Sequence, residues 1–262
     1  MESFKRLQYI YKIIKDFYPE LLRSEASTLF FNFMETTNLK SIDLPNQVIY
    51  SPYKKQRVNG QKIGFETPNR INKKYDSVIT SIPKSHEEAL GQIAQAYQKI
   101  KFGGVLFIEG SKRYGIDSIV KALSKKINIE HLSSKAHGKI AIIKVTSTKE
   151  KAFAKWLGYA SPSQNNEGFF SMPGLFSYNR IDPASKFLAS IFDDQINGQV
   201  IDLGAGWGYL SSKILKKCSM VESITLIDHD QRAIDCAKKN IESDKARFKW
   251  IDISEIHELG RN

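Results

Sequence analysis

Cysteine is scarce in this sequence, with two residues among 262, and its scarcity excludes two ways of stabilising a fold. Cys218 and Cys236 cannot build the disulfide framework that holds small secreted domains together. The five histidines are scattered without the spacing of metal ligands, so no zinc site is predicted either. We therefore expect no bound metal, and two cysteines that pack as small residues in a reducing compartment.

Long hydrophobic runs are missing as well. The longest, such as Val105–Ile108 and Ile140–Ile143, are far shorter than the roughly 20 apolar residues that span a bilayer. The N-terminal segment predicts an amphipathic helix, whose apolar positions are Phe4, Leu7, Ile10, Tyr11 and Ile14. Charges interrupt it and no small-residue cleavage site follows, which excludes a signal peptide. We expect a cytoplasmic protein without a membrane partner.

Positive charge is abundant but unevenly distributed. Residues 1–165 carry 27 Lys and Arg against 14 Asp and Glu, whereas residues 166–262 carry 12 against 14. A net charge of +13 on the first part predicts that it holds a polyanion such as RNA. The alternative is a lysine-rich surface that is merely solvated. The densest candidate RNA contacts are Lys54, Lys55, Arg57, Arg70, Lys73 and Lys74, with Tyr50, Tyr53 and Tyr75 as nearby stacking surfaces.

A polar stretch at Ser161–Gly168 predicts a boundary between two parts of the chain. We assign residues 1–160 to a first domain, 161–171 to a linker and 172–262 to a second domain. Strands and helices are predicted to alternate before the boundary, which indicates an α/β fold with a largely parallel sheet. The predicted strands are 76–81, 105–108, 127–132 and 140–145, and the predicted helices are 87–101 and 116–126.

The second part contains a glycine loop, Val-Ile-Asp-Leu-Gly-Ala-Gly-Trp-Gly at residues 200–208. An apolar strand ends at Asp202, and Gly204, Gly206 and Gly208 allow a sharp turn and close approach of a ligand to the main chain. A dinucleotide fingerprint would have glycine where Tyr209 begins the next helix. Asp202 would repel a pyrophosphate, but it could accept hydrogen bonds from a cationic amino-acid moiety. The loop therefore favours S-adenosylmethionine over NAD.

Two further strand ends carry acids that suit a nucleoside. The strand Ser223–Ile227 leads to Asp228, 24 residues after Gly204, where Rossmann-type units bind ribose hydroxyls. Asp252 lies near the end of a third strand, Phe248–Ile253, and could accept from an adenine amine. Asp228, Asp252 and the glycine loop could instead be ordinary strand terminators and turn punctuation. The remaining predicted cofactor contacts are Ala205 and His229.

The sequence also predicts a helix after the strand Ser223–Ile227. Asp230 is predicted to cap it, and its apolar positions recur at helical spacing. These positions are Ala233, Ile234, Ala237 and Ile241.

The motifs of both parts together resemble one family. The sequence Pro173-Gly174-Leu175-Phe176-Ser177, then Asp182-Pro183-Ala184-Ser185 and the glycine loop, resembles the catalytic half of the small-subunit ribosomal RNA guanine-N2 methyltransferases, type C. Pro83-Lys84-Ser85 and the segment 103–108 resemble the N-terminal half of that family. The similarity extends over most of the chain from about residue 76 onward.

The resemblance implies two Rossmann-like methyltransferase domains, of which only the C-terminal one binds S-adenosylmethionine. It implies that Ser81-Ile82-Pro83-Lys84 is a decayed Asn-Pro-Pro-aromatic motif, so that the first domain handles RNA without catalysing. It also implies that the segment with Phe176, Ser177 and Asp182 closes over the substrate. We expect the second domain to be incomplete, because the 63 residues from Val200 onward suffice for three strands and two helices rather than for the roughly six or seven strands of a doubly wound sheet. An intact Asn-Pro-Pro-aromatic motif is absent, so no catalytic residue can be named.

These observations predict an S-adenosylmethionine-dependent methyltransferase that acts on the exocyclic N2 of a guanine in small-subunit ribosomal RNA. We also expect the sequence to be a truncated copy of such an enzyme. Two alternatives stay open. One is a catalytically inactive RNA- or cofactor-binding remnant, and the other is an NAD-dependent oxidoreductase.

Overall fold

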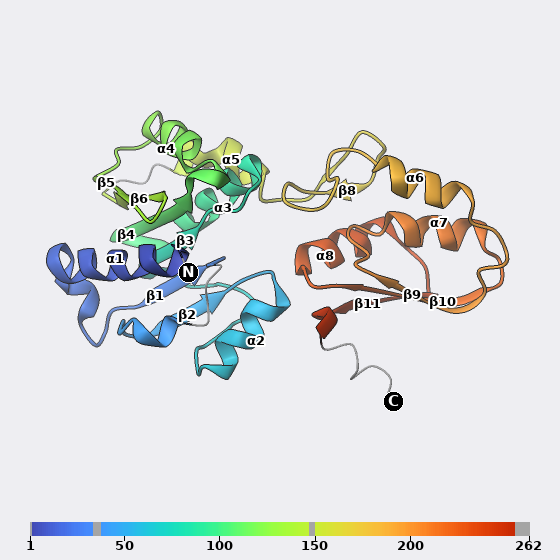
Figure 1. The fold of residues 1–262 in the computed structure, drawn as a ribbon, viewed down its shortest axis with the longest axis horizontal. Coiled ribbons are helices and arrows are strands. Elements are labelled where there is room, and N and C mark those ends of the chain that lie inside the picture. The colour runs from blue at the N-terminus through green and yellow to red at the C-terminus, as the bar shows by residue number, and fades with distance from the viewer. Residues whose placement is uncertain (1, 34–37, 147–149, 255–262) are drawn as a thin grey trace. The chain divides into compact units, whose positions relative to one another are not determined.

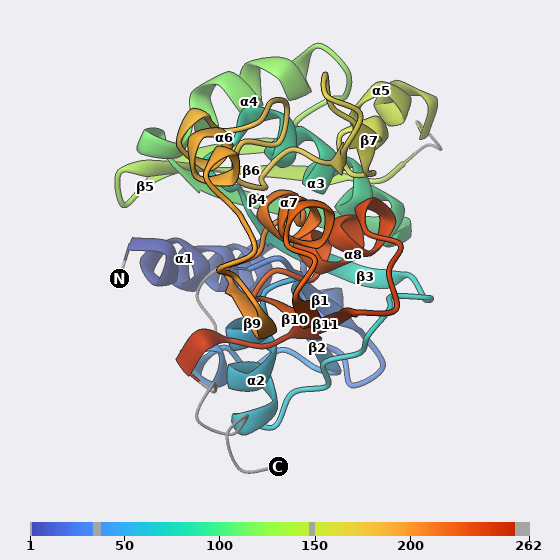
Figure 2. The same cartoon turned by 90° about the vertical axis from the view of Figure 1, so that its right-hand side faces the viewer.

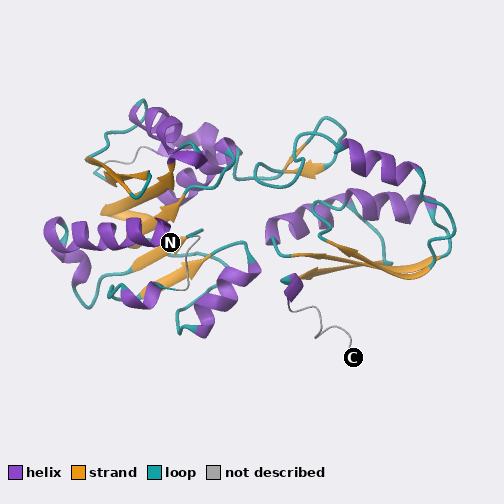
Figure 3. Cartoon of the chain, viewed as in Figure 1, coloured by secondary structure: helices purple, strands orange, loops and turns teal. Residues whose placement is uncertain are grey.

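The computed structural model describes residues 2–33, 38–146 and 150–254. The chain forms two compact units, each with its own sheet and core. The first unit comprises residues 1–51 and 56–160, and the second comprises residues 52–55 and 161–262. Residues 52–55 thus group with the second unit, although more than a hundred residues separate them from the rest of it in the sequence. The predicted α/β class is confirmed in both units (Figure 3).

A six-stranded sheet in the order β2-β1-β3-β4-β6-β5 forms the centre of the first unit. Its strands are β1 (Thr28–Phe31), β2 (Gln47–Tyr50), β3 (Tyr75–Ser81), β4 (Ile100–Ser111), β5 (His131–Lys135) and β6 (Gly138–Lys144). Strands β1 to β4 pair in parallel, whereas β6 is antiparallel to both β4 and β5. The sheet is therefore largely parallel, as expected, although β1 and β2 are not among the predicted strands. The strand predicted over 127–132 is shifted, because residues 125–130 form the turn and loop that lead into β5.

Helices cover both faces of this sheet (Figures 1 and 2). The α-helices are α1 (Glu2–Phe17), α2 (Lys54–Lys62), α3 (His86–Gln98), α4 (Ile116–Ser124) and α5 (Ala154–Gly158). Short 3-10 helices occur at Pro19–Leu22, Leu39–Ser41, Lys112–Tyr114 and Glu150–Phe153. The predicted N-terminal helix is therefore present as α1, and it buries Leu7, Ile10 and Ile14 against one face of the sheet.

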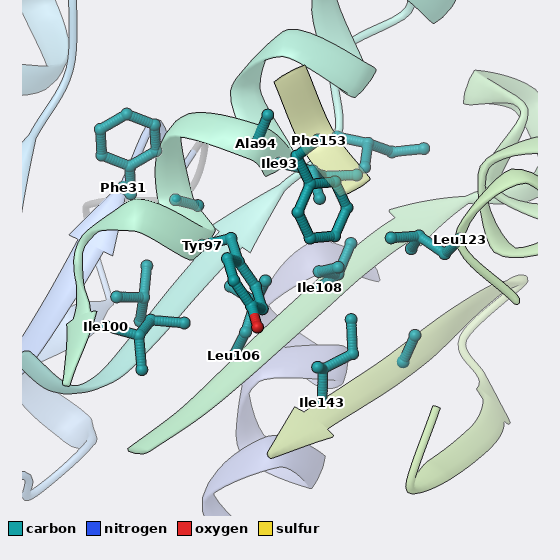
Figure 4. Packing of buried hydrophobic residues seen from close by; sticks show 14 of the residues in the cluster. Phe31, Ile93, Ala94, Tyr97, Ile100, Leu106, Ile108, Leu123, Ile143 and Phe153 are labelled. Atoms are coloured by element: carbon teal, nitrogen blue, oxygen red, sulfur yellow. The ribbon is translucent and has the colours of Figure 1, made fainter. Parts of the chain in front are cut away.

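The opposite face carries the larger core of the unit, which Figure 4 shows from close by. Ile93 and Tyr97 of α3 pack there on Leu106 and Ile108 of β4. Parallel strands that are buried on both faces read as continuous apolar sequence, which explains why 105–108 was recognisable as a strand. Ser85 caps α3 by accepting a hydrogen bond from the amide of Glu88.

The second unit is built on a three-stranded parallel sheet in the order β11-β10-β9. Its strands are β9 (Gly198–Leu203), β10 (Val221–Asp228) and β11 (Ala246–Trp250), and its helices are α6 (Pro183–Ser190), α7 (Tyr209–Lys217) and α8 (Gln231–Asn240). Figure 1 shows α7 and α8 on one face of this sheet. On the other face Ile201 and Leu203 of β9 are 60% and 51% exposed.

The predicted cap and face of α8 are confirmed. Asp230 accepts from the amide of Arg232 at the N-terminus of the helix. The four apolar positions predicted from the sequence are all buried, and three of them, Ala233, Ala237 and Ile241, belong to the cores of the second unit. Cys236, on the same helix, is fully buried, and burial raises the pKa of its thiol to about 12. Both cysteines are free thiols.

Residues 161–171, expected to be a linker, contain a small hairpin of β7 (Ser163–Gln164) and β8 (Phe170–Ser171). Asn240 at the end of α8 bonds to both backbone groups of Phe170, at 2.6 and 2.8 Å. The ring of Phe169 packs on Trp207 and Tyr209 beside the glycine loop. The sequence did not indicate this docking, because the aromatic pair follows a run of polar residues that is typical of a loop.

None of the described helices combines the length and the apolar character that a bilayer crossing requires.

Candidate functional site

The glycine loop connects β9 to α7 and needs glycine for its backbone conformation. Gly204, Gly206 and Gly208 have φ of +73°, +54° and +86°, a region that side chains with a Cβ rarely adopt. A Cβ on Gly208 would also lie 3.0 Å from Ile241 and 3.2 Å from Ala237, so α8 packs directly against this end of the loop. The helix begins at Tyr209, as the sequence predicted.

Asp202 is the penultimate residue of β9 and lies beside the loop. The hydroxyl of Ser211, on the first turns of α7, donates to its Oδ2 at 2.5 Å. Burial raises the pKa of Asp202, and the negative charge of Asp228 acts in the same direction, although the Ser211 hydrogen bonds oppose both. A cationic partner would stabilise the ionised form of this carboxylate.

Asp228 ends β10, the central strand, and is bonded to the glycine loop. Its Oδ2 accepts from the amide of Gly206 at 2.9 Å, and its Oδ1 accepts from the amide of Asp230 at 2.8 Å. Burial opposes ionisation, yet the hydrogen bonds from His229, Asp230 and Gly206 hold the pKa of Asp228 below its usual value. Asp228 therefore stays an anion at neutral pH and retains lone pairs for further donors.

His229 follows directly and adjoins this carboxylate. Its Nδ1 lies 3.3 Å from Oδ1 of Asp228, which raises the pKa of the imidazole; burial lowers it, and the charges of Asp230 and Asp252 raise it further. The ring of Tyr53 stacks on the imidazole of His229, with the ring centroids 5.6 Å apart and an angle of 17° between the ring planes.

Asp252 lies two residues beyond β11. Its Oδ1 accepts from the amide and the hydroxyl of Ser254 at 3.0 and 2.5 Å, and these bonds lower the pKa of Asp252. It lines a small cavity of about 150 Å³ together with Gly204, Asp228 and His229. The apolar walls of this cavity are Leu203, Ile227, Ile251 and Ile253.

A larger cavity of about 570 Å³ unites most of the predicted site. Asp202, Asp228, His229 and three residues of the loop, Gly204, Ala205 and Gly206, all line it. Gly208 does not; its role is the packing of the loop on α8.

The predicted substrate loop also borders this cavity, through Phe176, Ser177 and Asp182. Phe176 is 72% exposed, and its carbonyl accepts from Nε1 of Trp207 at 3.0 Å. Ser177 has a positive φ of +50° and donates to the carbonyl of Arg180, while Asp182 caps α6 by accepting from the amide of Ser185. The loop thus presents an exposed ring while its polar groups fix its own backbone.

The candidate RNA contacts are only partly on the surface. Arg70, Lys73 and Lys74 are exposed residues of the first unit, and Lys55 belongs to the second. Lys54 lies over the ring of Trp250 at 4.9 Å. Arg57 is buried, with its guanidinium on the carbonyl of Thr67 and the side chain of Asn69, so its assignment as an RNA contact is corrected to a structural role.

Two of the three tyrosines proposed as stacking surfaces are also occupied within the first unit. Tyr75 is buried in the core, and Tyr50 stacks on Phe31 with centroids 5.4 Å apart. The third, Tyr53, borders the cavity at the glycine loop.

Several residues of the site were not predicted. The cavity is also lined by Tyr53, Gly174, Leu175, Ser185, Trp207, Tyr209, Leu210, Asp230 and Ala233. Trp207 lies within the glycine loop and Tyr209 follows it directly, so their proximity in sequence was a usable signal. Tyr53 offered no such signal.

The residues present fit a nucleoside joined to a cationic group. Two carboxylates at neighbouring strand ends supply acceptors for hydroxyls and for an ammonium group, and the volume lies in the range of about 300–1,000 Å³ typical of ligand pockets. Among residues 2–33, 38–146 and 150–254, no group of three or more His, Cys, Asp or Glu side chains could hold a metal ion.

Comparison with known proteins agrees with this organisation. Residues 13–159 match the family Methyltransferase small domain N-terminal, and residues 166–260 match the family Methyltransferase small domain. The Ribosomal RNA small subunit methyltransferase C of Buchnera aphidicola subsp. Cinara cedri is 28% identical over 238 residues, which cover 88% of this chain and 68% of that protein. Its namesake from Buchnera aphidicola subsp. Acyrthosiphon pisum is 31% identical over 67% of this chain and 51% of its own length.

One solved structure is similar along nearly the whole chain. The 16S rRNA N2 methyltransferase RsmC of T. thermophilus, in complex with AdoMet and guanosine, superimposes with a TM-score of 0.71 at 18% identity. The superposition covers 90% of this chain and 69% of that one, and at this identity it establishes the fold. Since the N-terminal match alone covers more than half of the sequence, the chain belongs to the family Methyltransferase small domain N-terminal, and the relatives that align with most of it carry the name Ribosomal RNA small subunit methyltransferase C.

Proposed function

We propose that the cavity of the second unit binds S-adenosylmethionine and that the protein is an S-adenosylmethionine-dependent methyltransferase acting on ribosomal RNA. The observation that carries the proposal is the hydrogen bond from the amide of Gly206 to the carboxylate of Asp228. Both residues line one cavity together with Asp202. The similar T. thermophilus protein has AdoMet in its structure.

Each residue then has a specific task toward the cofactor. Asp202, with its pKa raised by burial, accepts from the ammonium of the methionine part. Asp228 accepts from the ribose hydroxyls, because its ionised form is already stabilised by backbone amides. Asp252 and the apolar walls of the smaller cavity hold the adenine ring. When bound, the cofactor supplies an electrophilic methyl group on a sulfonium.

We further propose that the acceptor is the exocyclic N2 of a guanine in small-subunit ribosomal RNA. The amine of guanine is a poor nucleophile because its lone pair is delocalised into the ring, so positioning of the flipped base accounts for most of the catalysis. The exposed ring of Phe176 at the edge of the cavity is the available stacking surface for that base. The relatives that carry the name Ribosomal RNA small subunit methyltransferase C support this substrate class.

The proposal is tested in two steps with the 262-residue chain. Calorimetry with S-adenosylhomocysteine should give saturable binding, and NAD should not compete with it. Transfer of a radiolabelled methyl group to guanosine in 16S rRNA then separates an enzyme from the alternative, a binding remnant. Binding without transfer would favour the remnant, because residues 1–262 contain no Asn-Pro-Pro-aromatic sequence. Absence of binding would contradict the proposal altogether.

RNA binding by the first unit is proposed from its charge and is tested separately. Replacing Arg70, Lys73 and Lys74 by Ala should weaken binding to 16S rRNA fragments uniformly across sequences. The slope of log affinity against log salt should fall by about 0.7–0.9 for each phosphate that is no longer neutralised. The matched control replaces Lys12, Lys15 and Lys40 with Ala, which removes the same charge elsewhere in the unit. Equal weakening in both triple variants would contradict a localised RNA site.

A further inference from the structure

A segment from the first third of the sequence forms part of the cavity wall. Tyr53 lies 149 residues before Asp202, yet it lines the same cavity as Asp202, Asp228 and the glycine loop. Its neighbours Pro52, Lys54 and Lys55 belong with it to the second unit. Neither the charge pattern nor the family motifs assign this segment to the cofactor site.

The backbone of the segment is held like a short strand against the end of β10. The amide of Lys54 donates to the carbonyl of His229 at 2.9 Å, and the amide of Gln231 donates to the carbonyl of Pro52 at 2.9 Å. Tyr53 and Asp230 thereby form an antiparallel bridge. The position of Tyr53 is consequently fixed by main-chain bonds on both of its sides.

The side chain is fixed independently at its ring and at its hydroxyl. The hydroxyl accepts from Nη2 of Arg232 at 2.9 Å, and the guanidinium lies over the ring, 5.3 Å from its centroid. Arg232 is itself held by Asp230, with Nη2 to Oδ2 at 2.7 Å and Nε to Oδ1 at 3.0 Å. The ring of Tyr53 therefore has little freedom, and the imidazole of His229 stacks on a fixed surface.

We propose that Tyr53 is a positioning residue of the cofactor site, which acts through His229 on the carboxylate of Asp228. By stacking on the imidazole, Tyr53 keeps Nδ1 directed at Oδ1 of Asp228 and so fixes the carboxylate that accepts the ribose hydroxyls. It also closes the wall of the cavity on this side and keeps water from the nucleoside. The inference rests on the proposed binding of S-adenosylmethionine and adds a residue to that site.

The test compares substitutions at residue 53 in the full chain. Tyr53→Leu removes the stacked ring and the hydroxyl while retaining an apolar side chain, and it should weaken S-adenosylhomocysteine binding about tenfold. Tyr53→Phe retains the ring and should stay within about threefold of the unmodified chain, because it removes only one neutral acceptor. Tyr114→Ala, at an exposed tyrosine of the first unit, is the matched control and should leave affinity unchanged.

A second readout does not depend on the cofactor. The pKa of His229 is measured by NMR titration, with the resonance identified from a His229→Gln variant. Asp228, Asp230 and Asp252 are the charges that face this imidazole. In Tyr53→Leu the pKa should fall toward the ordinary value, since the freed ring leaves Asp228, whereas in Tyr53→Phe it should stay raised.

The outcomes separate the two proposals. If the unmodified chain binds S-adenosylhomocysteine and Tyr53→Leu, still folded by circular dichroism, binds it equally well, Tyr53 has no role in the site. If the unmodified chain does not bind, the proposed function fails, and the titration of His229 alone decides whether Tyr53 positions that ring. An unchanged pKa of His229 in Tyr53→Leu would overturn the inference in either case.

Discussion

Both units carry acidic residues at the ends of their strands, but these acids are buried in the first unit and line a cavity in the second. In the first unit Glu109, near the end of β4, is almost fully buried and accepts from Arg6, Ser3 and Ser81. In the second unit Asp202 and Asp228 lie at the ends of neighbouring strands and line a cavity. An acid that is satisfied by its own chain stabilises a fold, whereas one that faces a cavity is available to a ligand.

The loops after the strands differ in the same sense. After β1 the chain continues with Asn32 and Phe33, both buried, and the side-chain amide of Asn32 donates to Gln92 at 3.3 Å. After β9 the chain continues with three glycines of positive φ. The first unit therefore fills with side chains the space that the second leaves open. Ser81, at the start of the segment interpreted as a decayed motif, belongs to this filled network.

The largest effect is expected from removing the buried carboxylate at the end of β4. Glu109→Ala would leave the guanidinium of Arg6 buried without its carboxylate, which typically costs about 3–5 kcal/mol. Urea denaturation, with hydrogen exchange of β3 and β4 followed by mass spectrometry, should show this loss of stability in the first unit. Exchange protection of β9 and β10 is expected to change little.

The control for that experiment is an exposed pair in the same unit. Lys101 and Asp76 are joined at 2.9 Å with side chains 48% and 29% exposed, so Lys101→Ala should cost less than about 1 kcal/mol. Similar destabilisation in Glu109→Ala and Lys101→Ala would contradict the claim that the buried acid at the end of β4 stabilises the first unit.

The converse substitution, Asp228→Ala, should reduce binding more than stability. Hydrogen bonds to a charged acceptor contribute about 1.5–3 kcal/mol each, so S-adenosylhomocysteine affinity should fall roughly tenfold or more. Calorimetry measures this directly. Asp235→Ala, an exposed acid on α8, removes the same charge and should leave affinity intact. Unchanged binding in Asp228→Ala would remove the ribose assignment.

The smallest effect concerns the pH dependence of stability that Asp228 and His229 produce at the end of β10. The pKa of Asp228 is lowered, so its contribution to stability is present above its unfolded value and is lost as pH falls through its folded value. The pKa of His229 is raised, so its contribution is full below about 6.5 and is lost as pH rises through its folded value. The interaction between them is therefore strongest at mildly acidic pH.

Comparison of the unmodified chain with His229→Gln measures this interaction. The difference in the free energy of unfolding should be largest near about pH 5–6 and decline toward about pH 8. It should stay below about 1 kcal/mol, because the imidazole is 58% exposed. A difference that does not vary with pH would show that His229 and Asp228 are not coupled.

Local patterns in the sequence predicted what depends on neighbouring residues. The start of α7 at Tyr209, the cap and buried face of α8, and the strand leading to Asp228 follow from glycine conformation, helical spacing and β-branched composition. The roles of Asp202 and Asp228 toward a cofactor stay predictions. Their position in one cavity follows because parallel strands bring their carboxyl ends to the same edge.

Features that depend on tertiary packing were missed. The sequence places Tyr53 beside basic residues, although its contacts are with His229 and Arg232, far away in the sequence. Composition predicts a surface charge at Arg57, because it does not reveal which face of α2 is buried. The hairpin at Phe170 depends on Asn240, a single polar residue at the end of a helix 70 residues later.

The buried thiol of Cys236 allows the movement of α8 to be followed by the rate of alkylation. With a pKa of about 12, almost none of it is thiolate at neutral pH, and the thiolate is the form that reacts with alkylating reagents. Cys236 lies on α8, between the capping residue Asp230 and Ala237, on which Gly208 packs. Alkylation of Cys236 therefore requires α8 to move away from the sheet and the glycine loop. Its rate should report how often α8 separates from the glycine loop, and a ligand that holds the loop against α8 should slow it.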